Sequence, residues 1–290
     1  MALINSAFTP EALAGNTPHV LRDVVRVRGP QADAGHDDIA REQAVALEYN
    51  GISHAALMAS PAHIEELALG FSFTEGIIES PADVLDLDVE TTALGLIAHL
   101  RITSARLHAL KLRRRSLMGR TSCGLCGVES LGEVPRALPA LAAPASPWTR
   151  AAIDHALGQL RQCQPLHNLT GATHAAAWAT TQGSIAFIYE DVGRHNALDK
   201  LIGRLLCEPT DRTQGFIVVS SRASFEMVQK THAAGVRALV AVSAPTTLAI
   251  ELAHSAGILL AGFAREDRFT VYAHPEHLDL SASQALSQRA

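Results

Sequence analysis

Apolar and polar residues recur with two different periods along the second half of the chain, from about residue 150 onwards. Short apolar runs of strand length alternate with longer segments in which apolar residues return every three or four positions, as on one face of a helix. The expected strands cover residues 183–190, 215–221, 238–244, 258–264 and 268–274. The expected helices cover residues 149–162, 196–206, 224–235 and 246–257. This alternation predicts an α/β domain over residues 150–280, with a mainly parallel sheet and helices on both faces.

The region before this domain follows a different pattern. Apolar and polar positions alternate on both sides of Asn50 and Gly51, a dipeptide that favours a two-residue type I′ turn, so a β-hairpin is expected there. Ser60 is expected to cap a helix that has Pro61 in its first turn, and two more strand-like runs follow. Residues 41–120 are therefore predicted to form a smaller α+β domain.

Three other segments show no sustained period. Residues 1–40 mix Pro, Gly, Asp and Asn and are expected to form a flexible N-terminal arm. Residues 121–149 combine two closely spaced cysteines with small residues and then a Pro- and Ala-rich run, which predicts a mobile loop and a linker. Residues 281–290 are expected to be a tail.

Composition and charge limit the classes of partner. A chain of 290 residues with 48% hydrophobic residues can bury a sizeable core. A formal net charge of -5 gives no general basic field, so nucleic acid is not an expected partner. The N-terminal sequence lacks the charged and apolar regions of a secretion signal, and there is no apolar run of about 18 residues. These features predict a cytoplasmic protein that has no membrane partner.

Four loops follow the expected strands, at the edge where α/β sheets bind ligands. They cover residues 190–196, 220–224, 243–247 and 262–268. The loops contribute Arg194, His195, Arg222, Arg265 and Arg268, beside hydroxyl groups and the N-termini of helices. For any one loop, ordinary helix caps and solvated arginines are the favoured explanation. Four of them at one edge favour an anion-binding site, with phosphate the expected group.

Histidines near this edge have no settled role on the basis of sequence. His195 and His174 are each open between a hydrogen-bonded structural role and a catalytic one.

Cys123 and Cys126 form the second candidate site. Two thiols at this spacing suit half of a zinc site, a redox couple or a sulfur carrier. Zinc needs further ligands, and Cys163 and Cys207 are single residues that are interpreted as small buried apolar side chains, so no metal site is predicted. A thioredoxin-like pair would open a helix after a strand, whereas this pair stands between glycines.

A cationic stretch precedes the cysteine pair. Between residues 90 and 129 there is no acidic residue, whereas arginines and a lysine recur from Arg101 to Arg120. These positive charges can stabilise a thiolate or a persulfide anion on Cys123, although they are equally compatible with a solvated surface.

Several strings in the sequence closely resemble the FdhD/NarQ family of formate dehydrogenase accessory sulfurtransferases. They are ALMASPAHIEELALGFSFTEGII, TSCGLCGVESL, TGATHAAAW, EDVGRHNALDKLIG, SSRASFEMVQK and GFAREDRFTVY. The resemblance runs from about residue 41 to residue 280.

The resemblance implies a fold, a reaction and a set of partners. The C-terminal domain would have a cytidine-deaminase-like α/β fold. The protein would take sulfur from a cysteine desulfurase as a persulfide on Cys123, with Cys126 assisting relay or resolution. It would pass the sulfur to a bis-(molybdopterin guanine dinucleotide) molybdenum cofactor destined for apo formate dehydrogenase. A homodimer is expected from the family alone.

The same resemblance assigns a ligand to the anion-binding edge. The family's cofactor-contacting stretch corresponds to Phe263, Ala264, Arg265, Glu266, Asp267 and Arg268. His195 and Arg222, which belong to the same edge, are included in the predicted cofactor site.

Two other functions are weighed against this interpretation. One is a non-enzymatic chaperone that binds the molybdenum cofactor and uses its cysteine pair only to dock partners. The other is a zinc nucleobase deaminase, which is disfavoured because the H-x-E and P-C-x-x-C ligand motifs of that class are missing from the sequence.

Overall fold

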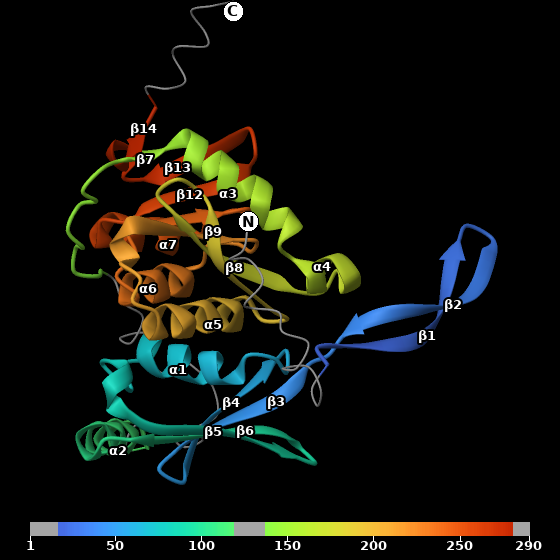
Figure 1. Ribbon diagram of the computed structural model, residues 1–290, viewed down its shortest axis with the longest axis horizontal. Coiled ribbons are helices and arrows are strands. Elements are labelled where there is room, and N and C mark those ends of the chain that lie inside the picture. The colour runs from blue at the N-terminus through green and yellow to red at the C-terminus, as the bar shows by residue number, and fades with distance from the viewer. Residues whose placement is uncertain (1–16, 119–136, 281–290) are drawn as a thin grey trace, which may run out of the picture.

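The structure is a computed structural model that describes residues 17–118 and 137–280. Its larger domain contains a six-stranded sheet in the order β13-β12-β11-β10-β8-β9 (Figure 1). The strands are β8 (His174–Thr180), β9 (Ile185–Asp191), β10 (Gly215–Val219), β11 (Ala238–Ala241), β12 (Leu259–Arg265) and β13 (Arg268–Ala273). The predicted α/β class is confirmed.

The sheet is mixed, whereas the sequence predicted a mainly parallel one. The pairs β10-β11 and β11-β12 are parallel, and the pairs β10-β8, β8-β9 and β12-β13 are antiparallel. Strand β8 caused the difference, because it was not recognised as a strand. Its sequence HAAAWAT consists largely of alanine, which has a weak strand preference, and its interior positions are buried on both faces, so no alternation marks it.

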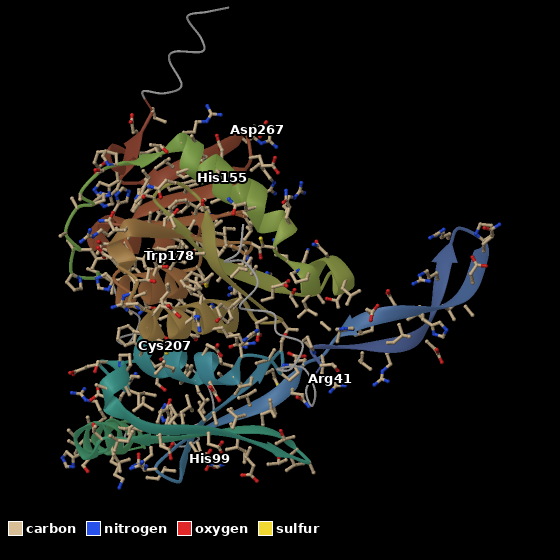
Figure 2. All side chains as sticks on the ribbon, in the orientation of Figure 1. Arg41, His99, His155, Trp178, Cys207 and Asp267 are labelled. Atoms are coloured by element: carbon tan, nitrogen blue, oxygen red, sulfur yellow. The ribbon has the colours of Figure 1, made fainter. Side chains whose placement is uncertain are left out.

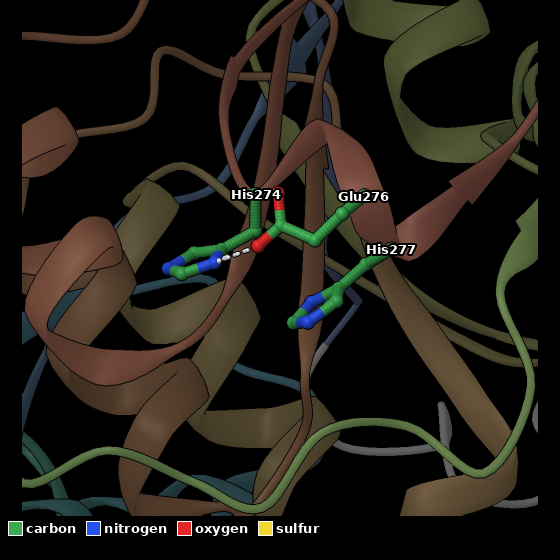
Figure 3. Close-up of side chains that lie close together, drawn as sticks. All are labelled: His274, Glu276 and His277. Atoms are coloured by element: carbon green, nitrogen blue, oxygen red, sulfur yellow. Dashed lines mark hydrogen bonds and ion pairs between the residues drawn. The ribbon is translucent and has the colours of Figure 1, made fainter.

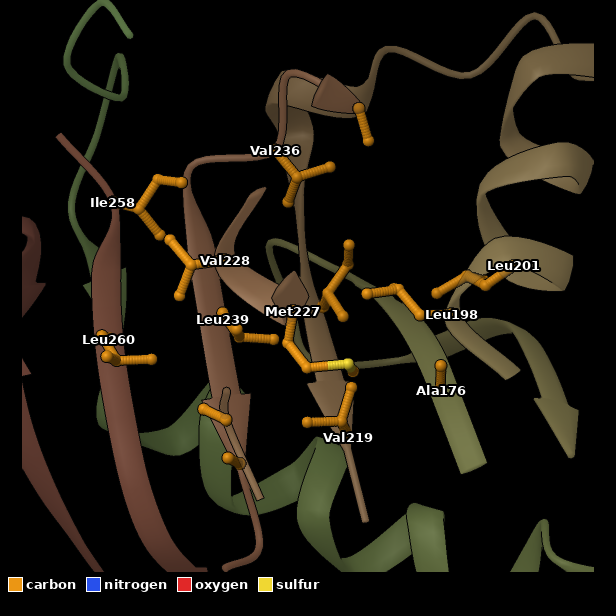
Figure 4. Packing of buried hydrophobic residues seen from close by; sticks show 14 of the residues in the cluster. Ala176, Leu198, Leu201, Val219, Met227, Val228, Val236, Leu239, Ile258 and Leu260 are labelled. Atoms are coloured by element: carbon orange, nitrogen blue, oxygen red, sulfur yellow. The ribbon is translucent and has the colours of Figure 1, made fainter. Parts of the chain in front are cut away.

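Helices cover both faces of this sheet, as predicted. Helix α3 (Arg150–Gln162) packs on one face, and α5 (Arg194–Cys207), α6 (Phe225–Ala233) and α7 (Thr247–Ala256) pack on the other. Figure 4 shows the core on the second face, where Met227 and Val228 of α6 meet Val219 and Leu239 of the central strands.

Short elements complete this domain. They are β7 (Trp148–Thr149), α4 (Pro165–Thr170), the 3₁₀ turns η3 (Arg212–Gln214) and η4 (Pro275–His277), and β14 (Leu278–Asp279), which pairs with β7. Part of the predicted linker also belongs here, because the Leu141 amide donates to the carbonyl of Ala256 and His232 contacts the carbonyl of Pro139. This described part of the linker, around Pro139 and Leu141, therefore lies against α6 and α7. None of the helices in the described ranges is long and apolar enough to cross a membrane.

The smaller domain is the predicted α+β unit. Its sheet has the order β4-β3-β6-β5, and its elements are β3 (Gln43–Tyr49), β4 (Ile52–Ala59), α1 (Ile64–Thr74), η2 (Pro81–Asp83), β5 (Val84–Thr92), β6 (Gly95–Ile102) and α2 (Ser104–Met118). Asn50 and Gly51 both have positive φ angles in the β3-β4 turn, as predicted. Ser60 is not the cap of α1, because that helix begins only after His63.

Residues 19–40 form a long antiparallel hairpin, where the sequence predicted a flexible arm. Strands β1 (His19–Arg28) and β2 (Gln31–Ala40) pair over their full length and project from the body of the protein (Figure 1). Most of their side chains are exposed on both faces, so no buried face imposes a clear alternation on the sequence.

The two domains meet where α1 packs against α5 (Figure 1). Gly70 of α1 and Gly203 of α5 permit this close approach. A Cβ atom added to Gly70 would lie 1.8 Å from the carbonyl oxygen of Asp199, and one added to Gly203 would lie 2.0 Å from that of Glu66. Any side chain larger than hydrogen at these two positions would force the helices apart.

Candidate functional site

A cavity of about 930 Å³ opens at one edge of the six-stranded sheet, on the side covered by α3 and α4. The C-terminal ends of β9, β10, β11 and β12 lie at this edge together with the N-terminal end of β8, because β8 runs antiparallel to its neighbours. We refer to it as the cavity edge. The lining residues are Leu157, Leu160, Arg161, Gln164, His167, Asn168, Gly171, Ala172, Thr173, His174, Ser220, Val242, Ala264, Arg265, Glu266 and Asp267.

Glu190 fixes the wall of the cavity formed by α4. The amides of Leu166 and His167 donate to its two carboxylate oxygens at 2.9 and 2.7 Å, and the Thr173 hydroxyl donates at 3.0 Å. Burial raises the pKa of Glu190, although these three donors oppose the shift. One carboxylate at the end of β9 thus anchors both ends of the α4 segment, a role that sequence reasoning did not assign to Glu190.

His174 begins β8 and faces the cavity. Burial lowers the pKa of His174, and the positive charges of Arg194, His167 and Arg222 lower it further. Arg194 also has a buried Nε atom with no hydrogen-bond partner among the described residues. Positive groups therefore act on this end of the cavity, while Glu266 and Asp267 place carboxylates in the same lining.

The predicted cofactor-contacting stretch forms the tip of the β12-β13 hairpin. Residues 264–267 line the main cavity, whereas Phe263 and Arg268 line a second hollow of about 270 Å³. Arg265 lines both hollows and donates to the carbonyl oxygens of Val242 and Ala264. The hairpin tip therefore separates two hollows that share one guanidinium group.

Two features distinguish this tip: a hydrogen bond from α3 and an unusual backbone conformation at Phe263. Arg150, at the start of α3, donates to the carbonyl oxygen of Asp267 at 2.9 Å, and Figure 2 shows Asp267 beside that helix. Phe263 has a φ angle of 51° and is 53% exposed, an unusual backbone conformation for an aromatic residue and one that turns its ring outward.

The other two predicted binding residues lie differently. Arg222 is exposed and follows the cavity residue Ser220, and its charge acts on His174. His195 is not among the residues that line the cavity, because it lies on α5 and pairs with Glu226 of α6, with Nε2 2.8 Å from Oε2. The hydrogen bond to His195 lowers the pKa of Glu226. The predicted set is thus divided between the two sides of the sheet.

The segment EDVGRHNALDK is largely a structural element. Asp191 and Lys200 form a fully buried ion pair of 2.6 Å between Oδ2 and Nζ. The amide of Ser60 donates to Asp191, and Lys200 donates to the carbonyl oxygen of Ser60. Asn196 donates to both Asp191 and the carbonyl oxygen of Met58. These bonds attach the smaller domain to the cavity edge, where Ser60 has the role of an interdomain contact.

A second buried ion pair joins the same domains. Lys230 of α6 lies 3.0 Å from both carboxylate oxygens of Asp199 on α5. Thr74, the last residue of α1, donates to Asp199 and accepts from Lys230, and Glu75 completes the cluster. We therefore assign Asp199 and Lys230 to the domain junction.

The cysteine pair Cys123 and Cys126 lies outside the described residues. The other two cysteines differ from the prediction that they are buried: Cys163 is half-buried, and Cys207, at the end of α5, is exposed (Figure 2). Both are free thiols, and burial of part of each side chain raises its pKa, so neither is activated as a nucleophile.

An α/β domain with an open cavity at its strand ends has the architecture of the α/β proteins that bind ligands at this edge. The overall fold is similar to a solved structure from Desulfotalea psychrophila described as a formate dehydrogenase accessory protein. The TM-score is 0.70, and the match covers 90% of this chain and 99% of that one at 20% sequence identity. At this identity the likeness establishes the fold.

Sequence comparisons then give the family. Residues 40–279 match the FdhD/NarQ family, and the chain belongs to it. It is 52% identical over 259 residues to the sulfur carrier protein FdhD of Bordetella petrii, which covers 89% of this chain and 93% of that protein. It is 51% identical over 288 residues to the protein of the same name from Cupriavidus necator, covering 98% of this chain and 100% of that protein.

Proposed function

We propose that this protein is a sulfur carrier that sulfurates the molybdenum cofactor of formate dehydrogenase. The observation that carries the proposal is the match, at about half identity and nearly full length, to proteins named as sulfur carriers. Members of one family at that identity keep their fold and the arrangement of their sites. The sequence also has the CGLCG loop that a sulfur carrier needs.

Loading begins with an exchange between two sulfur species. The thiolate of Cys123 attacks the terminal sulfur of a persulfide on a cysteine desulfurase. A new S–S bond forms on Cys123, the S–S bond of the donor breaks, and the desulfurase cysteine leaves as a thiolate. The exchange consumes no oxidant or reductant.

Unloading assigns a separate task to Cys126. Its thiolate attacks the inner sulfur of the Cys123 persulfide, so a disulfide forms between the two cysteines and the outer sulfur leaves as sulfide. The sulfide becomes a ligand of the molybdenum centre. Two electrons thus pass from the thiols to the transferred sulfur, and a cellular dithiol must reduce the disulfide before the next cycle.

The cavity edge is the proposed binding site for the bis-(molybdopterin guanine dinucleotide) molybdenum cofactor, which is the cargo of the reaction. A volume of about 930 Å³ suits one nucleotide arm of that cargo, since ligand pockets are about 300–1,000 Å³. Arg265 and His174 supply cationic or polar groups for phosphate, and Arg194 has an unpartnered buried donor nearby. Glu266 and Asp267 can accept hydrogen bonds from a guanine base. The loaded carrier would then deliver its cargo to apo formate dehydrogenase.

Intact-protein mass spectrometry tests the carrier role. The protein is incubated with an active cysteine desulfurase and cysteine, beside the variants Cys123→Ala and Cys126→Ala. We expect the mass of one sulfur atom to be added to the wild type and to Cys126→Ala, to be lost on reduction, and to be absent from Cys123→Ala.

The same experiment distinguishes the sulfur carrier from the chief alternative, a cofactor-binding chaperone. If the wild type gains no sulfur while the desulfurase is demonstrably active, the protein is a cofactor-binding chaperone without a carrier cysteine. Full complementation of formate dehydrogenase activity in cells by a Cys123→Ala, Cys126→Ala double variant would support the same conclusion.

A further inference from the structure

Three side chains with metal-binding groups converge at the turn that follows β13. His274, Glu276 and His277 belong to a segment of four residues, and one ligand atom from each lies within 4.8 Å of the others. Figure 3 shows the two imidazole rings and the carboxylate grouped on this turn. His274 Nδ1 lies 2.7 Å from Glu276 Oε1. The rings of His274 and His277 stack at 16° with their centroids 5.0 Å apart, so one ring must turn for both to direct a nitrogen at a shared ion.

His274 is held as a metal-binding histidine is held. Its Nε2 atom lies 3.0 Å from the carbonyl oxygen of His254, in the last turn of α7. A carbonyl oxygen only accepts hydrogen bonds, so Nε2 carries the proton that is donated. Metal-binding histidines commonly donate their second N–H group to a backbone carbonyl in this way, which fixes the ring and directs the other nitrogen to the metal.

The third candidate ligand is a ring nitrogen of His277. Its Nδ1 atom is buried and has no hydrogen-bond partner among the described residues. A buried polar atom in this condition costs stability unless a ligand satisfies it.

We propose that His274, Glu276 and His277 bind a divalent transition-metal ion of the zinc type. Two imidazoles and one carboxylate suit such an ion, whose bonds to nitrogen and oxygen are about 2.0–2.2 Å long. Bonds from His274 Nδ1 and Glu276 Oε1 to the ion replace the contact between these two atoms, and any proton between them passes to solvent. Three protein ligands leave one position for water or for an external ligand.

The proposed site is separate from the cavity edge. Strand β13 starts at the hairpin tip beside the cavity and runs antiparallel to β12, with Ala273 paired to Leu260 near the start of β12. His274 therefore lies at the opposite edge of the sheet. The proposed metal site does not depend on the sulfur-carrier role. No metal site was predicted from the cysteines in the sequence.

Cobalt is a suitable probe because its spectrum reports its ligands. The full-length protein, without an affinity tag, is stripped with a chelator, kept reduced and titrated with Co²⁺. We expect visible d–d bands that saturate at one equivalent and lack the ultraviolet charge-transfer band of a thiolate ligand. Zn²⁺ added afterwards should displace the cobalt and abolish the bands.

Substitutions of the ligands identify the site. His274→Ala and His277→Ala should each weaken cobalt binding at least about tenfold, since even the loss of an outer partner of a metal ligand costs about 10–100-fold. His99→Ala is the matched control, because His99 also lies between two carboxylates, those of Glu48 and Glu90, and its loss should leave binding unchanged. Circular dichroism without metal verifies that each variant is folded.

Two results would overturn the proposal. One is a wild-type protein whose spectrum Co²⁺ does not change. The other is a set of cobalt bands that survives both histidine substitutions and is accompanied by a thiolate charge-transfer band. That result would show that the metal binds to cysteines instead.

Discussion

The two sides of the cavity edge use polar residues in opposite ways. On the α5 side, Asp191 accepts hydrogen bonds from Ser60, Gly193, Asn196 and Lys200, and the ion pair with Lys200 is fully buried. On the α3-α4 side, polar and charged side chains line an open cavity of about 930 Å³. The same strand, β9, serves both sides: Asp191 accepts hydrogen bonds at the domain junction, and Glu190 anchors the α4 segment that lines the cavity.

This difference separates residues of the domain junction from residues that support the cavity within one short motif. Successive residues of a strand point to opposite faces of the sheet, so neighbours in sequence can have unrelated functions. A distinctive sequence such as EDVGRHNALDK is therefore no guide to which of its members touch a ligand. In this chain Asp191, Asn196 and Lys200 join two domains, whereas Glu190 shapes the cavity.

The largest expected effect on stability comes from removing the buried ion pair at the domain junction. Lys200→Met should destabilise the protein by about 3–5 kcal/mol, because it leaves the Asp191 carboxylate buried without its partner. Urea unfolding followed by circular dichroism measures the change. Arg161→Met, an exposed substitution on the cavity side, should alter stability by no more than about 0.5 kcal/mol. Equal losses in the two variants would contradict the division.

The same kind of substitution, glycine to alanine, should change stability in opposite directions on the two sides. Gly70→Ala should cost about 1–3 kcal/mol, because the new methyl group collides with the backbone of α5. Gly158→Ala in α3 meets nothing closer than 3.9 Å and should stabilise that helix by about 0.5–1 kcal/mol. Thermal unfolding of both variants under the same conditions tests the pair, and a stabilised Gly70→Ala would show that α1 and α5 pack less closely than described.

The cavity side should lose binding without losing stability. Diguanosine pyrophosphate serves as a probe that carries a guanine dinucleotide's bases and phosphates. Arg265→Leu should weaken its binding at least about tenfold, since hydrogen bonds to charged groups are worth about 1.5–3 kcal/mol. Isothermal titration calorimetry measures the affinity. Arg101→Leu, at an exposed position of β6 in the other domain, is the control for a general loss of charge, and binding should not change.

The smallest expected effect is a pH dependence due to His174. Its lowered pKa means that the free protein holds the ring neutral near neutral pH, whereas a bound phosphate favours the protonated ring. Binding should then take up protons, so affinity for diguanosine pyrophosphate should rise about two- to fivefold as the pH falls from about 7.5 to about 5.5. The probe's pyrophosphate diester does not titrate in this range.

His174→Gln should remove most of this pH dependence. The sign for stability is the reverse: a depressed histidine pKa means that the unfolded chain binds more protons below about pH 6.5, so acid destabilises the free wild type. An affinity that falls with acidification in the wild type would exclude His174 from the binding site.

Much of the fold was predictable because most elements show a clear period. The β3-β4 hairpin, the α/β alternation and helices on both faces follow from periodicity and from turn residues such as Asn50 and Gly51. Strand β8 and the β1-β2 hairpin were missed for opposite reasons. The first is buried on both faces and the second is exposed on both, so neither has the half-buried alternation that marks a strand.

The sequence predicted the edge of the sheet at which the cavity opens better than it predicted the individual residues there. Strand ends and arginines indicated the edge at which the cavity opens, and residues 264–267 line that cavity. His195 was placed with them because the loops were treated as one surface, whereas it faces Glu226 on the other side. Glu190 and α4 carried no signal, since their roles depend on hydrogen bonds between segments more than 20 residues apart in sequence.

The projecting hairpin has a consequence for the behaviour of the protein in concentrated solution. Its two strands pair only with each other among the described elements, so both outer edges present unpaired backbone groups to any neighbouring molecule. Charged side chains occupy these edges, with ion pairs such as Arg26 to Asp37 and His36 to Asp23. Charge of this kind discourages edge-to-edge pairing, so the hairpin carries its own protection against aggregation, and neutral substitutions there should lower colloidal stability before they alter the fold.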